Sequence, residues 1–458
     1  VIHFLNRTSF GPTFEEAERA ARIGLDAYLD EQLVPERISD QAVEEKIAGL
    51  KTMRLNSREL FDLYPPPKVA KERGMTMPGA MNAPRFIIYE LQQARVLRAV
   101  YSQRQLSELM VDFWSNHFNI FAAKGADRWL MTSYDRDTIR PHALGKFRNL
   151  LLATAHSPAM LFYLDNWLSV SPNAGMRLPV NARRRGLNEN YARELMELHT
   201  LGVDGGYTQQ DVREVARCFT GWTLLRPRGD AEYHFEPRLH DASAKTVLGT
   251  RIAAGGEEDG IKVIDLLARH PATAKFIAGK LVRRFVSDQP PAALVHRAAD
   301  AFRQSDGDIR TVLQSIIDSP EFYSSEAYQA KVKKPLEFVA SALRATRAET
   351  RITPQLLRYL ARMGEPLFLA QPPTGYPDVG SSWISPDMLL TRMNFAADLV
   401  ANRLEGTRFE SSRLRDNTTV ARLVAPEGLS SPTKAVLAEA DNNDRLALLF
   451  AAPEFQRR

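Results

Sequence analysis

The stretch Asn188-Glu-Asn-Tyr-Ala-Arg-Glu-Leu-Met-Glu-Leu-His-Thr-Leu-Gly202 shows the pattern that decides the fold of this chain. Its polar residues Asn190, Glu194 and Glu197 recur at i, i+4 and i+7, so they lie along one stripe of a helix. An apolar stripe runs beside it at similar spacing, formed by Tyr191, Leu195 and Leu198. A polar stripe beside a buried one is either a solvated helix face or the wall of a cleft, and both interpretations stay open.

Apolar residues at helical spacing recur through most of the chain. Two capping boxes, Thr13-Phe-Glu-Glu16 and Thr208-Gln-Gln-Asp211, mark the starts of helices. The one strong strand signal lies between Tyr233 and Ile252, where Tyr233-His-Phe-Glu236 and Lys245-Thr-Val-Leu248 flank a polar bend and predict one β-hairpin. The sequence shows neither strand–helix–strand alternation nor a repeat of fixed period. We therefore predict a mostly α class, with a compact multi-lobed helical fold and one small β-hairpin.

The loop signals divide the chain into lobes rather than into clearly linked domains. We expect residues 1–458 to form a single helical unit with lobes at 1–168, 187–330 and 331–458. A surface loop is predicted at 169–186, which holds two prolines, two glycines and a run of arginines. A second one is predicted at 371–385, which is long and aperiodic, and such loops are usually functional or mobile.

The composition is that of a soluble globular protein able to bury a large core, with 44% hydrophobic and 25% charged residues. The net charge is only +5 and the basic clusters are short, so nucleic-acid binding is not expected. Cys218 is the only cysteine, which excludes an intrachain disulfide and a cysteine-rich zinc site. No apolar run is long enough for an ordinary transmembrane helix. The chain opens at Val1 without a methionine, which is typical of a mature or trimmed product, and whether Val1 is the mature terminus stays open.

The first candidate for chemistry is the carboxylate pair Glu194 and Glu197, one helical turn apart. Such carboxylates repel, and partial burial would raise the pKa of one of them, so that it could serve as a general acid in glycosidic bond cleavage. Asn190 and Arg193 could orient the substrate. The alternative is that both carboxylates pair with basic residues of other helices and only stabilise their packing.

His199 lies in the last turn of the same helix, where the helix dipole favours its charged form, so it is either an acid–base group or a capping residue. It cannot share a metal ion with Glu197, because residues two apart face different sides of a helix. The HExxH motif is absent. No cofactor is predicted, but metal binding stays open, because ligands could come from other segments, such as His117, His240 or Asp241.

Three further segments mix aromatic and polar residues. In Phe113-Trp-Ser-Asn-His-Phe118, Trp114 could stack on a sugar ring, and His117 is either a site residue or a satisfied core histidine. The second segment is Leu239-His-Asp241 in the predicted hairpin, and the third is the loop that holds Trp383. The GxSxG elbow, the P-loop and the Rossmann glycine motif are absent, so nucleotide hydrolysis and dinucleotide chemistry are unsupported.

Motifs along nearly the whole chain resemble those of the bacterial family catalogued as domain of unknown function eighteen-hundred. The string Asn188-Glu-Asn-Tyr-Ala-Arg-Glu-Leu-Met-Glu-Leu-His199 matches the hallmark of that family and is very specific. Other matching segments are Leu5-Asn-Arg-Thr-Ser-Phe-Gly11, Phe113-Trp-Ser-Asn-His-Phe118, Ile139-Arg-Pro-His-Ala-Leu-Gly145, Tyr207-Thr-Gln-Gln-Asp-Val212, Thr220-Gly-Trp222 and His240-Asp241.

The resemblance implies a largely α-helical bacterial protein that is exported to the periplasm or the cell exterior. It also implies a gene neighbour that is often a sulfatase-like exported protein, which would be a co-exported partner. It supplies no established reaction. The family signature gathers between Asn188 and His199, and because these residues are polar, the resemblance favours a site there.

Our hypothesis is an exported enzyme, of glycoside hydrolase or polysaccharide lyase type, that cleaves a polysaccharide or another envelope polymer. Glu194 or Glu197 would be the general acid or base, assisted by His117 or His199. The expected substrate-binding residues are Asn116, Asn188, Asn190, Arg193, Tyr207, His240 and Asp241, with Trp114, Trp222 and Trp383 as stacking surfaces. One alternative is a non-catalytic helical scaffold or binding partner of a co-exported enzyme, in which the polar string is a buried hydrogen-bond network. Another is a metal-dependent hydrolase or oxygenase.

Overall fold

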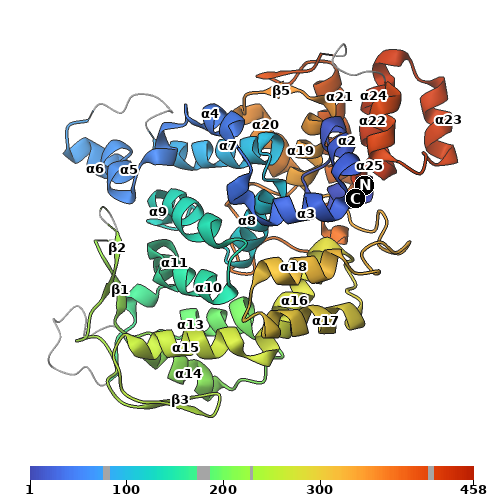
Figure 1. The fold of residues 1–458 in the computed structure, drawn as a ribbon. Helices are drawn as coiled ribbons and strands as arrows, with labels where there is room; N and C mark the ends of the chain where they lie inside the picture. Colours follow the sequence, from blue (N-terminus) through green and yellow to red (C-terminus); the bar gives the residue numbers. More distant parts are fainter. Residues whose placement is uncertain (76–82, 173–185, 227–228, 230, 411–416) are drawn as a thin grey trace.

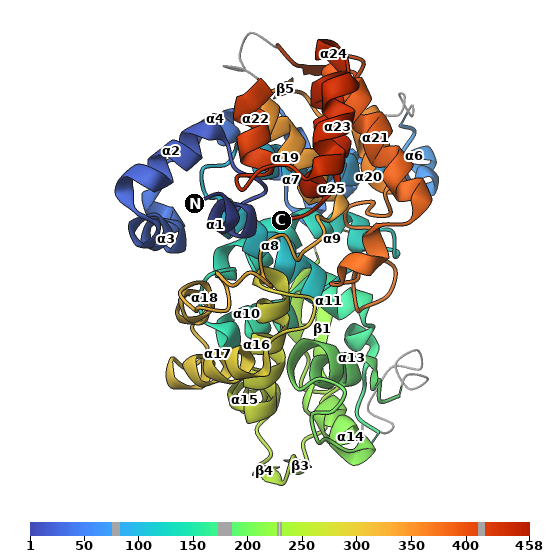
Figure 2. The ribbon, with the colours of Figure 1, turned by 90° about the vertical axis from the view of Figure 1, so that its right-hand side faces the viewer.

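A computed structural model describes residues 1–75, 83–172, 186–226, 229, 231–410 and 417–458. The described chain is mostly helical and its strands form two-stranded sheets, which confirms the mostly α class. The N-terminal and C-terminal helices lie together in the upper half of both ribbon views, and the middle of the chain forms the lower half (Figure 1, Figure 2). The end of the chain returns to its middle, where Arg457 pairs with Val332 in an isolated bridge.

The N-terminal part begins its second helix at the predicted capping box. The Thr13 side chain accepts a hydrogen bond from the Glu16 N–H, and the Glu16 carboxylate accepts one from the Thr13 N–H. The α-helices of this part are α1 (Ile2–Thr8), α2 (Phe14–Ile23), α3 (Leu25–Leu33), α4 (Gln41–Ile47), α5 (Ser57–Leu63), α6 (Pro67–Glu72), α7 (Arg85–Tyr101), α8 (Gln105–His117) and α9 (Asp127–Ser133). Its other helical turns are η1 (Pro35–Arg37), η2 (Lys51–Arg54), η4 (Tyr134–Ile139) and η5 (Arg140–His142).

The middle part carries two β-hairpins where one was predicted. Strand β1 (Trp222–Leu225) pairs with β2 (Glu232–Phe235), and β3 (Lys245–Val247) pairs with β4 (Thr250–Ile252). The predicted pairing of β2 with β3 was wrong, because Leu248 and Gly249 both adopt positive φ and close a tight two-residue turn that returns β3 onto β4.

The helices of the middle part follow the predicted rhythm, and the second capping box opens α14 as expected. They are α10 (Phe147–His156), α11 (Pro158–Tyr163), η6 (Asn166–Leu168), α13 (Asn190–Glu194), η8 (Leu195–Thr200), α14 (Gln209–Cys218), α15 (Glu258–Arg269), α16 (Pro271–Phe285), α17 (Ala292–Gln304) and α18 (Ile309–Ile317).

The C-terminal part packs back against the N-terminal helices, with α19 against α7. A third two-stranded ladder joins β5 (Glu349–Thr350) to β6 (Thr407–Arg408). The helices here are α19 (Pro335–Thr346), α20 (Pro354–Arg362), η9 (Gly380–Trp383), α21 (Pro386–Val400), α22 (Asn417–Val424), α23 (Ser431–Glu439), α24 (Asn442–Ala451) and α25 (Pro453–Gln456).

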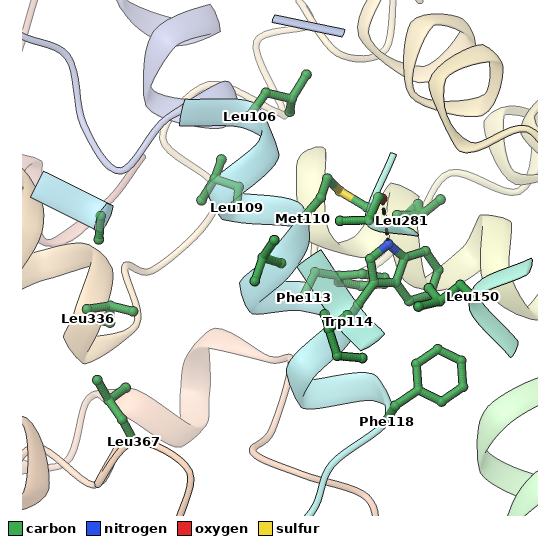
Figure 3. Close-up of a cluster of buried hydrophobic side chains, with 14 of the residues drawn as sticks. Leu106, Leu109, Met110, Phe113, Trp114, Phe118, Leu150, Leu281, Leu336 and Leu367 are labelled. Carbon is green, nitrogen blue, oxygen red and sulfur yellow. Dashed lines mark hydrogen bonds between the residues drawn. The ribbon is translucent and has the colours of Figure 1, made fainter. Parts of the chain in front are cut away.

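Helix α8 lies within the larger of two apolar core clusters in the described residues, whose members range along the chain from Phe4 to Phe455. In Figure 3, Leu336 and Leu367 lie on one side of this helix, and Trp114 lies on the other side together with further apolar residues. Burial of each large apolar side chain contributes roughly 1.5–3 kcal/mol. The C-terminal end of α8 is therefore a firmly held place from which to position polar groups.

Two segments of the described chain are π-helical. They are η4 (Tyr134–Ile139) and η8 (Leu195–Thr200), so the Asn188 segment is not one continuous α-helix. Helix α13 ends at Glu194, and the wider π turn that follows carries Glu197 and His199. Turns of this kind are rare and occur frequently at functional sites.

Of the two predicted surface loops, only 371–385 lies wholly within the described residues. Most of 169–186 lies outside the described residues. The segment 371–385 is irregular, as predicted, and contains the short turn η9. In the described ranges, no helix combines the length and the apolar character that crossing a membrane requires.

Candidate functional site

The C-terminal end of α8 holds down the loop formed by residues 366–378. Asn116 uses both of its polar groups, donating to the Tyr376 carbonyl at 2.9 Å and accepting from the Tyr376 N–H at 2.7 Å. Asn119 donates to two further loop carbonyls, those of residues 370 and 372. Gly375 has a φ of +70°, and a Cβ there would lie 2.4 Å from the Asn116 carbonyl, so only glycine permits this close approach. Asn116, which was predicted to bind substrate, thus anchors the 366–378 loop to the end of α8 through hydrogen bonds.

Beside this loop lies a charged cavity of about 40 Å³, which we call the Glu365 cavity. This volume holds water molecules but is far below the roughly 300–1,000 Å³ of a pocket that encloses a small-molecule ligand. Helices α7, α8, α9 and η4 supply part of its wall, together with residues just after α8, the 365–376 segment and the residue before α19. Its charged residues are Arg95, Asp112, Asp135, Lys334 and Glu365.

Arg95 is the central cation of the Glu365 cavity. Its guanidinium donates to Asp135 Oδ1 at 2.6 Å, to Ser115 Oγ at 2.9 Å and to Asp112 Oδ1 at 3.3 Å. Burial by itself would raise the pKa of Asp135, but the positive charges of Arg95 and Arg140 outweigh it and hold that pKa below its ordinary value. Asp135 is therefore ionised at neutral pH.

Glu365 has the opposite protonation state. Its side chain is buried, and Oε2 accepts a hydrogen bond from the Leu336 N–H in the first turn of α19 at 2.8 Å. Burial, reinforced by the negative charge of Asp112, raises the pKa of Glu365 to about 8, although Lys334 acts against this rise. A protonated carboxyl in one cavity with the ionised carboxylate of Asp135 is an arrangement suited to acid–base catalysis.

Lys334 connects the cavity to a second buried cation, Lys280. The ammonium of Lys334 donates to Asp378 Oδ1 at 3.4 Å, and that of Lys280 lies 3.6 Å from Asp378 Oδ2. Burial lowers the pKa of Lys280, although Asp378 partly restores it. Two cations on one carboxylate can stabilise negative charge that develops on a substrate nearby.

The predicted catalytic pair, Glu194 and Glu197, lies on a half-buried face of α13 and η8. Burial, and then the charge of Glu197, raises the pKa of Glu194, which is the predicted direction. Within the described residues, Glu194 makes no hydrogen bond and no ion pair, while Glu197 accepts a hydrogen bond from the Tyr207 hydroxyl at 3.3 Å. Neither carboxylate is paired there with a basic residue, as the packing alternative would require.

The other polar residues of this segment make local contacts. The side chains of Asn188 and Asn190 donate to the backbone carbonyls of residues 165 and 164. Arg193 donates to the side chain of Gln209 at 3.0 Å. These contacts fix the start of α13 against neighbouring segments, and the substrate-binding roles of Asn188, Asn190, Arg193 and Tyr207 stay predictions.

Both predicted assisting histidines are buried. His117 Nε2 lies 3.1 Å from the His199 carbonyl, which can only accept, so Nε2 is the donor. Burial, and then the positive charge of Lys280, lowers the pKa of His117 well below its ordinary value and that of His199 to about 3. The expectation that the helix dipole favours a charged His199 is therefore wrong, because burial beside a lysine outweighs the dipole. Both rings are neutral at physiological pH.

The three tryptophans predicted as stacking surfaces lie in the core. Trp114 and Trp222 are 0% exposed, and Trp383 is 2% exposed. The Trp114 indole N–H donates to the Ala143 carbonyl at 2.9 Å, and Trp222 stacks on His156 with ring centroids 4.7 Å apart. A sugar ring needs an open aromatic face, so the stacking prediction was wrong at these positions. Large rings at helical spacing bury the most apolar area and are taken up by the core.

His240 belongs to a buried network with Lys245 and Asp259. Its Nδ1 lies 2.7 Å from the Thr220 carbonyl, and its Nε2 lies 3.2 Å from Asp259 Oδ2 and 3.3 Å from the Lys245 ammonium. Lys245 also donates to Asp259 Oδ2 at 2.6 Å and to the Asp241 carbonyl. These contacts tie β3 to α15, while Asp259 Oδ1 is buried without a hydrogen-bond partner among the described residues.

The Asp241 carboxylate is engaged as well. It accepts hydrogen bonds from Arg217 Nε at 2.9 Å and from the Ser243 N–H at 3.0 Å. Burial alone would raise the pKa of Asp241, but the hydrogen bonds from Arg217 and Ser243 hold it below the ordinary value. The polar groups of His240 and Asp241 therefore face protein partners rather than a cleft.

The sequence did not decide whether the protein has a metal site. In the part of the chain that the structure describes, no group of three or more His, Cys, Asp or Glu side chains is arranged to hold a metal ion. His117 contacts His199, whereas His240 and Asp241 lie in the network around Lys245. The metal-dependent alternative gains no ligand set from these residues.

Sequence reasoning missed all five charged residues of the Glu365 cavity, including Arg95 in α7. Asp112 directly precedes the Phe113-to-Phe118 motif, and a carboxylate inside a strongly apolar helix is the signal that could have found it. Glu365 and Lys334 lie in irregular connections between helices, and Asp135 lies in a π turn that sequence patterns do not predict. These positions are far apart in the chain and meet only when it is folded.

Comparison with known proteins identifies the family but no function. The sequence profile of the family described as protein of unknown function (DUF1800) matches residues 3–457. The chain therefore belongs to this family, which confirms the resemblance seen in its motifs. No curated protein and no solved structure matches the chain.

Proposed function

We propose that the protein is a hydrolase that cleaves a polysaccharide or another envelope polymer by carboxylate acid–base chemistry, with the Glu365 cavity as its centre. The observation that carries this proposal is one cavity that holds Glu365, whose pKa is raised to about 8, beside the ionised Asp135 and the negative charge of Asp112. Carboxyl groups with separated pKa values can act as acid and base near neutral pH. The proposal moves the acid from the Glu194 and Glu197 pair to Glu365.

Glu365 would be the general acid. Its carboxyl proton would pass to the leaving-group oxygen as the bond to that oxygen breaks, leaving Glu365 as a carboxylate. Asp112 would accept a proton from the water molecule whose oxygen forms the new bond. One water is then split across the substrate bond, and transfer of the proton from Asp112 to Glu365 restores the starting state. Arg95 holds Asp112, and Lys334 offsets the negative charge formed on Glu365.

The size of the cavity limits how a polymer can lie. A cavity of about 40 Å³ has room for the attacking water but not for a whole sugar ring. We therefore place the polymer across the mouth of the cavity, against the 366–378 loop that Asn116 and Asn119 hold down.

The test compares Glu365→Gln with Glu194→Gln and Glu197→Gln on a panel of bacterial polysaccharides, with release of reducing or unsaturated ends as the readout. Glutamine at 365 keeps an acceptor for the Leu336 N–H but cannot donate the proton, so kcat should fall by about 10²–10⁴-fold. The other two variants should stay within about threefold of wild type. Full activity in Glu365→Gln would refute the proposal, and a loss in the other two instead would return the chemistry to the π turn.

The second candidate function is a non-catalytic scaffold or binding partner of a co-exported enzyme. The buried network of His240, Lys245 and Asp259 favours it, because most of its polar groups contact other protein groups, as they would if residues of these polar motifs served packing. Under this reading, wild type cleaves no polymer of the panel, and charge-removing substitutions in the Glu365 cavity change stability only.

Export to the periplasm or the cell exterior is part of the proposal. It rests on the likeness to the family, whose members are expected to carry a targeting segment. Fractionation of the native bacterial cells, with an antibody raised against this chain, tests it: recovery in the cytosolic fraction would contradict export.

A further inference from the structure

A second cavity shares a wall with the Glu365 cavity and is rich in arginine. We call it the arginine pocket. Its volume is about 440 Å³, within the range of pockets that enclose ligands. Asp135 lines both cavities. The walls of the arginine pocket come from α4, η2, α7, η4 and η5, and α4 lies against α7 in Figure 1. Its arginines are Arg54, Arg98, Arg136 and Arg140.

Backbone contacts bring two of these arginines onto one wall. Arg136 Nη1 donates to the Met53 carbonyl at 2.9 Å and to the Leu55 carbonyl at 3.2 Å, on either side of Arg54. This pair of bonds fixes η2 against η4. Arg54 itself is exposed and, among the described residues, makes no hydrogen bond and no ion pair. Its charge is therefore available to a ligand.

The other two arginines have exchangeable or incomplete contacts. Arg140 Nη1 donates to Glu108 at 2.6 Å, but its Nη2 lies 3.5 Å from Asp135 Oδ2, which is long for a hydrogen bond. Arg98 donates to Glu44, whose side chain is 56% exposed. Arg98 itself is only 14% exposed and also lies 3.9 Å from Glu108 Oε1, but the Glu44 carboxylate is solvated, so an incoming anion can take its place.

We propose that the arginine pocket binds a sulfate, phosphate or carboxylate group, and that this group is a substituent of the polymer cleaved at the Glu365 cavity. Guanidinium groups suit such oxyanions because their planar forks donate two parallel hydrogen bonds. Asp135, shared by both cavities, places the bound group next to the proposed reaction centre. The charge of Asp135 does not repel the anion strongly, because Arg95 and Arg140 contact its two oxygens. The substrate class rests on the proposed function, whereas binding of the oxyanion does not.

The experiment measures binding to the full chain by isothermal titration calorimetry with three separate probes: sodium sulfate, sodium phosphate and sodium glucuronate. Sodium chloride at matched ionic strength corrects for general screening. The variants are Arg54→Gln, which removes an exposed charge without breaking a contact, and Arg98→Gln. The matched control is Arg269→Gln, an exposed arginine of α15 outside the pocket that is 64% exposed.

At least one probe should bind wild type and the Arg269 variant at a single site, with affinity reduced at least tenfold in Arg54→Gln and in Arg98→Gln. The probe that binds most tightly identifies the substituent. Equal affinity in all three variants, or no binding beyond the chloride control, would overturn the site. Failure of the proposed function is separable: Glu365→Gln should keep the anion affinity of wild type whatever its effect on polymer cleavage.

Discussion

Replacement of Glu365 by glutamine should make the protein progressively more stable than wild type as the pH rises. Glutamine resembles the protonated carboxyl in shape, and its side-chain oxygen can still accept from the Leu336 N–H. Burial of the wild-type carboxyl has a pH-dependent cost in folding free energy that burial of glutamine lacks. The buried carboxyl has a pKa raised to about 8 by burial and by Asp112, against an ordinary value of 4.5 in the unfolded chain.

The sign follows from proton binding. Between these two pKa values the native carboxyl holds its proton while the unfolded one has lost it, so unfolding releases a proton and the stability of wild type falls as pH rises. From about pH 5.5 to about pH 7.5, this single group costs wild type about 2.5 kcal/mol. Buried histidines such as His199, with a lowered pKa, change stability in the opposite direction, but they are common to both proteins and cancel in the difference.

The assay is urea unfolding followed by tryptophan fluorescence, at about pH 5.5 and about pH 7.5, for wild type, Glu365→Gln and the control Glu72→Gln. Glu72 lies at the exposed end of α6. The stability of Glu365→Gln relative to wild type should rise by about 2.5 kcal/mol between the two pH values, while that of the control should not change. An infrared titration gives a second readout, because the C=O stretch of one protonated carboxyl should persist to near-neutral pH in wild type and be absent from the variant.

The reasoning would be refuted if the stability difference between Glu365→Gln and wild type were the same at both pH values and no infrared band differed between the two proteins. Glu365 would then titrate near its ordinary pKa, and the cavity would lack its proton donor. The proposed mechanism would fail with it, whatever substrate is later found.

Three further predictions follow from the same structure. Lys245→Met should lower the free energy of unfolding in urea by about 3–5 kcal/mol, because it leaves the buried carboxylate of Asp259 without its cation. A second change, Asp259→Leu, should recover much of that loss. Unchanged stability in Lys245→Met would contradict the role of this buried ion pair. Asp112→Asn should lower the native pKa of Glu365, so the stability loss in the urea titration should end at a lower pH and be smaller in total, whereas an unchanged profile would show that the two groups do not interact. Trp114→Phe should cost about 2 kcal/mol, since it removes the hydrogen bond to Ala143, and it should leave polysaccharide affinity unchanged; a selective loss of affinity would restore the stacking role.

Local signals explain what the sequence predicted well. The capping boxes at Thr13 and Thr208 open helices as expected, because a cap joins residues only three apart. The helical class follows from apolar spacing, which is also a local property. The hairpin error has a local cause as well, since the pair Leu248 and Gly249 closes a tight turn that the strand pattern did not reveal.

The Asn188-to-His199 string shows where local reasoning ends. It predicted that partial burial of two neighbouring carboxylates would raise the pKa of one of them, and burial and then the charge of Glu197 raise the pKa of Glu194. It did not predict the π turn at 195–200, nor that Lys280, a residue of a distant helix, would lie near His199 and help to lower its pKa.

The sequence by itself determined that this chain is mostly α-helical, that it belongs to its family, and where its polar motifs lie. Only the tertiary structure decided which of those motifs face the core and which face a cavity. The pKa of Glu365 is the clearest case, because it depends on burial and on the charges of Asp112 and Lys334. Glu365, Asp112 and Lys334 lie in three separate parts of the chain. Periodicity and capping act over a few residues, whereas burial and Coulomb interactions depend on distance in space, which the order of residues alone does not state.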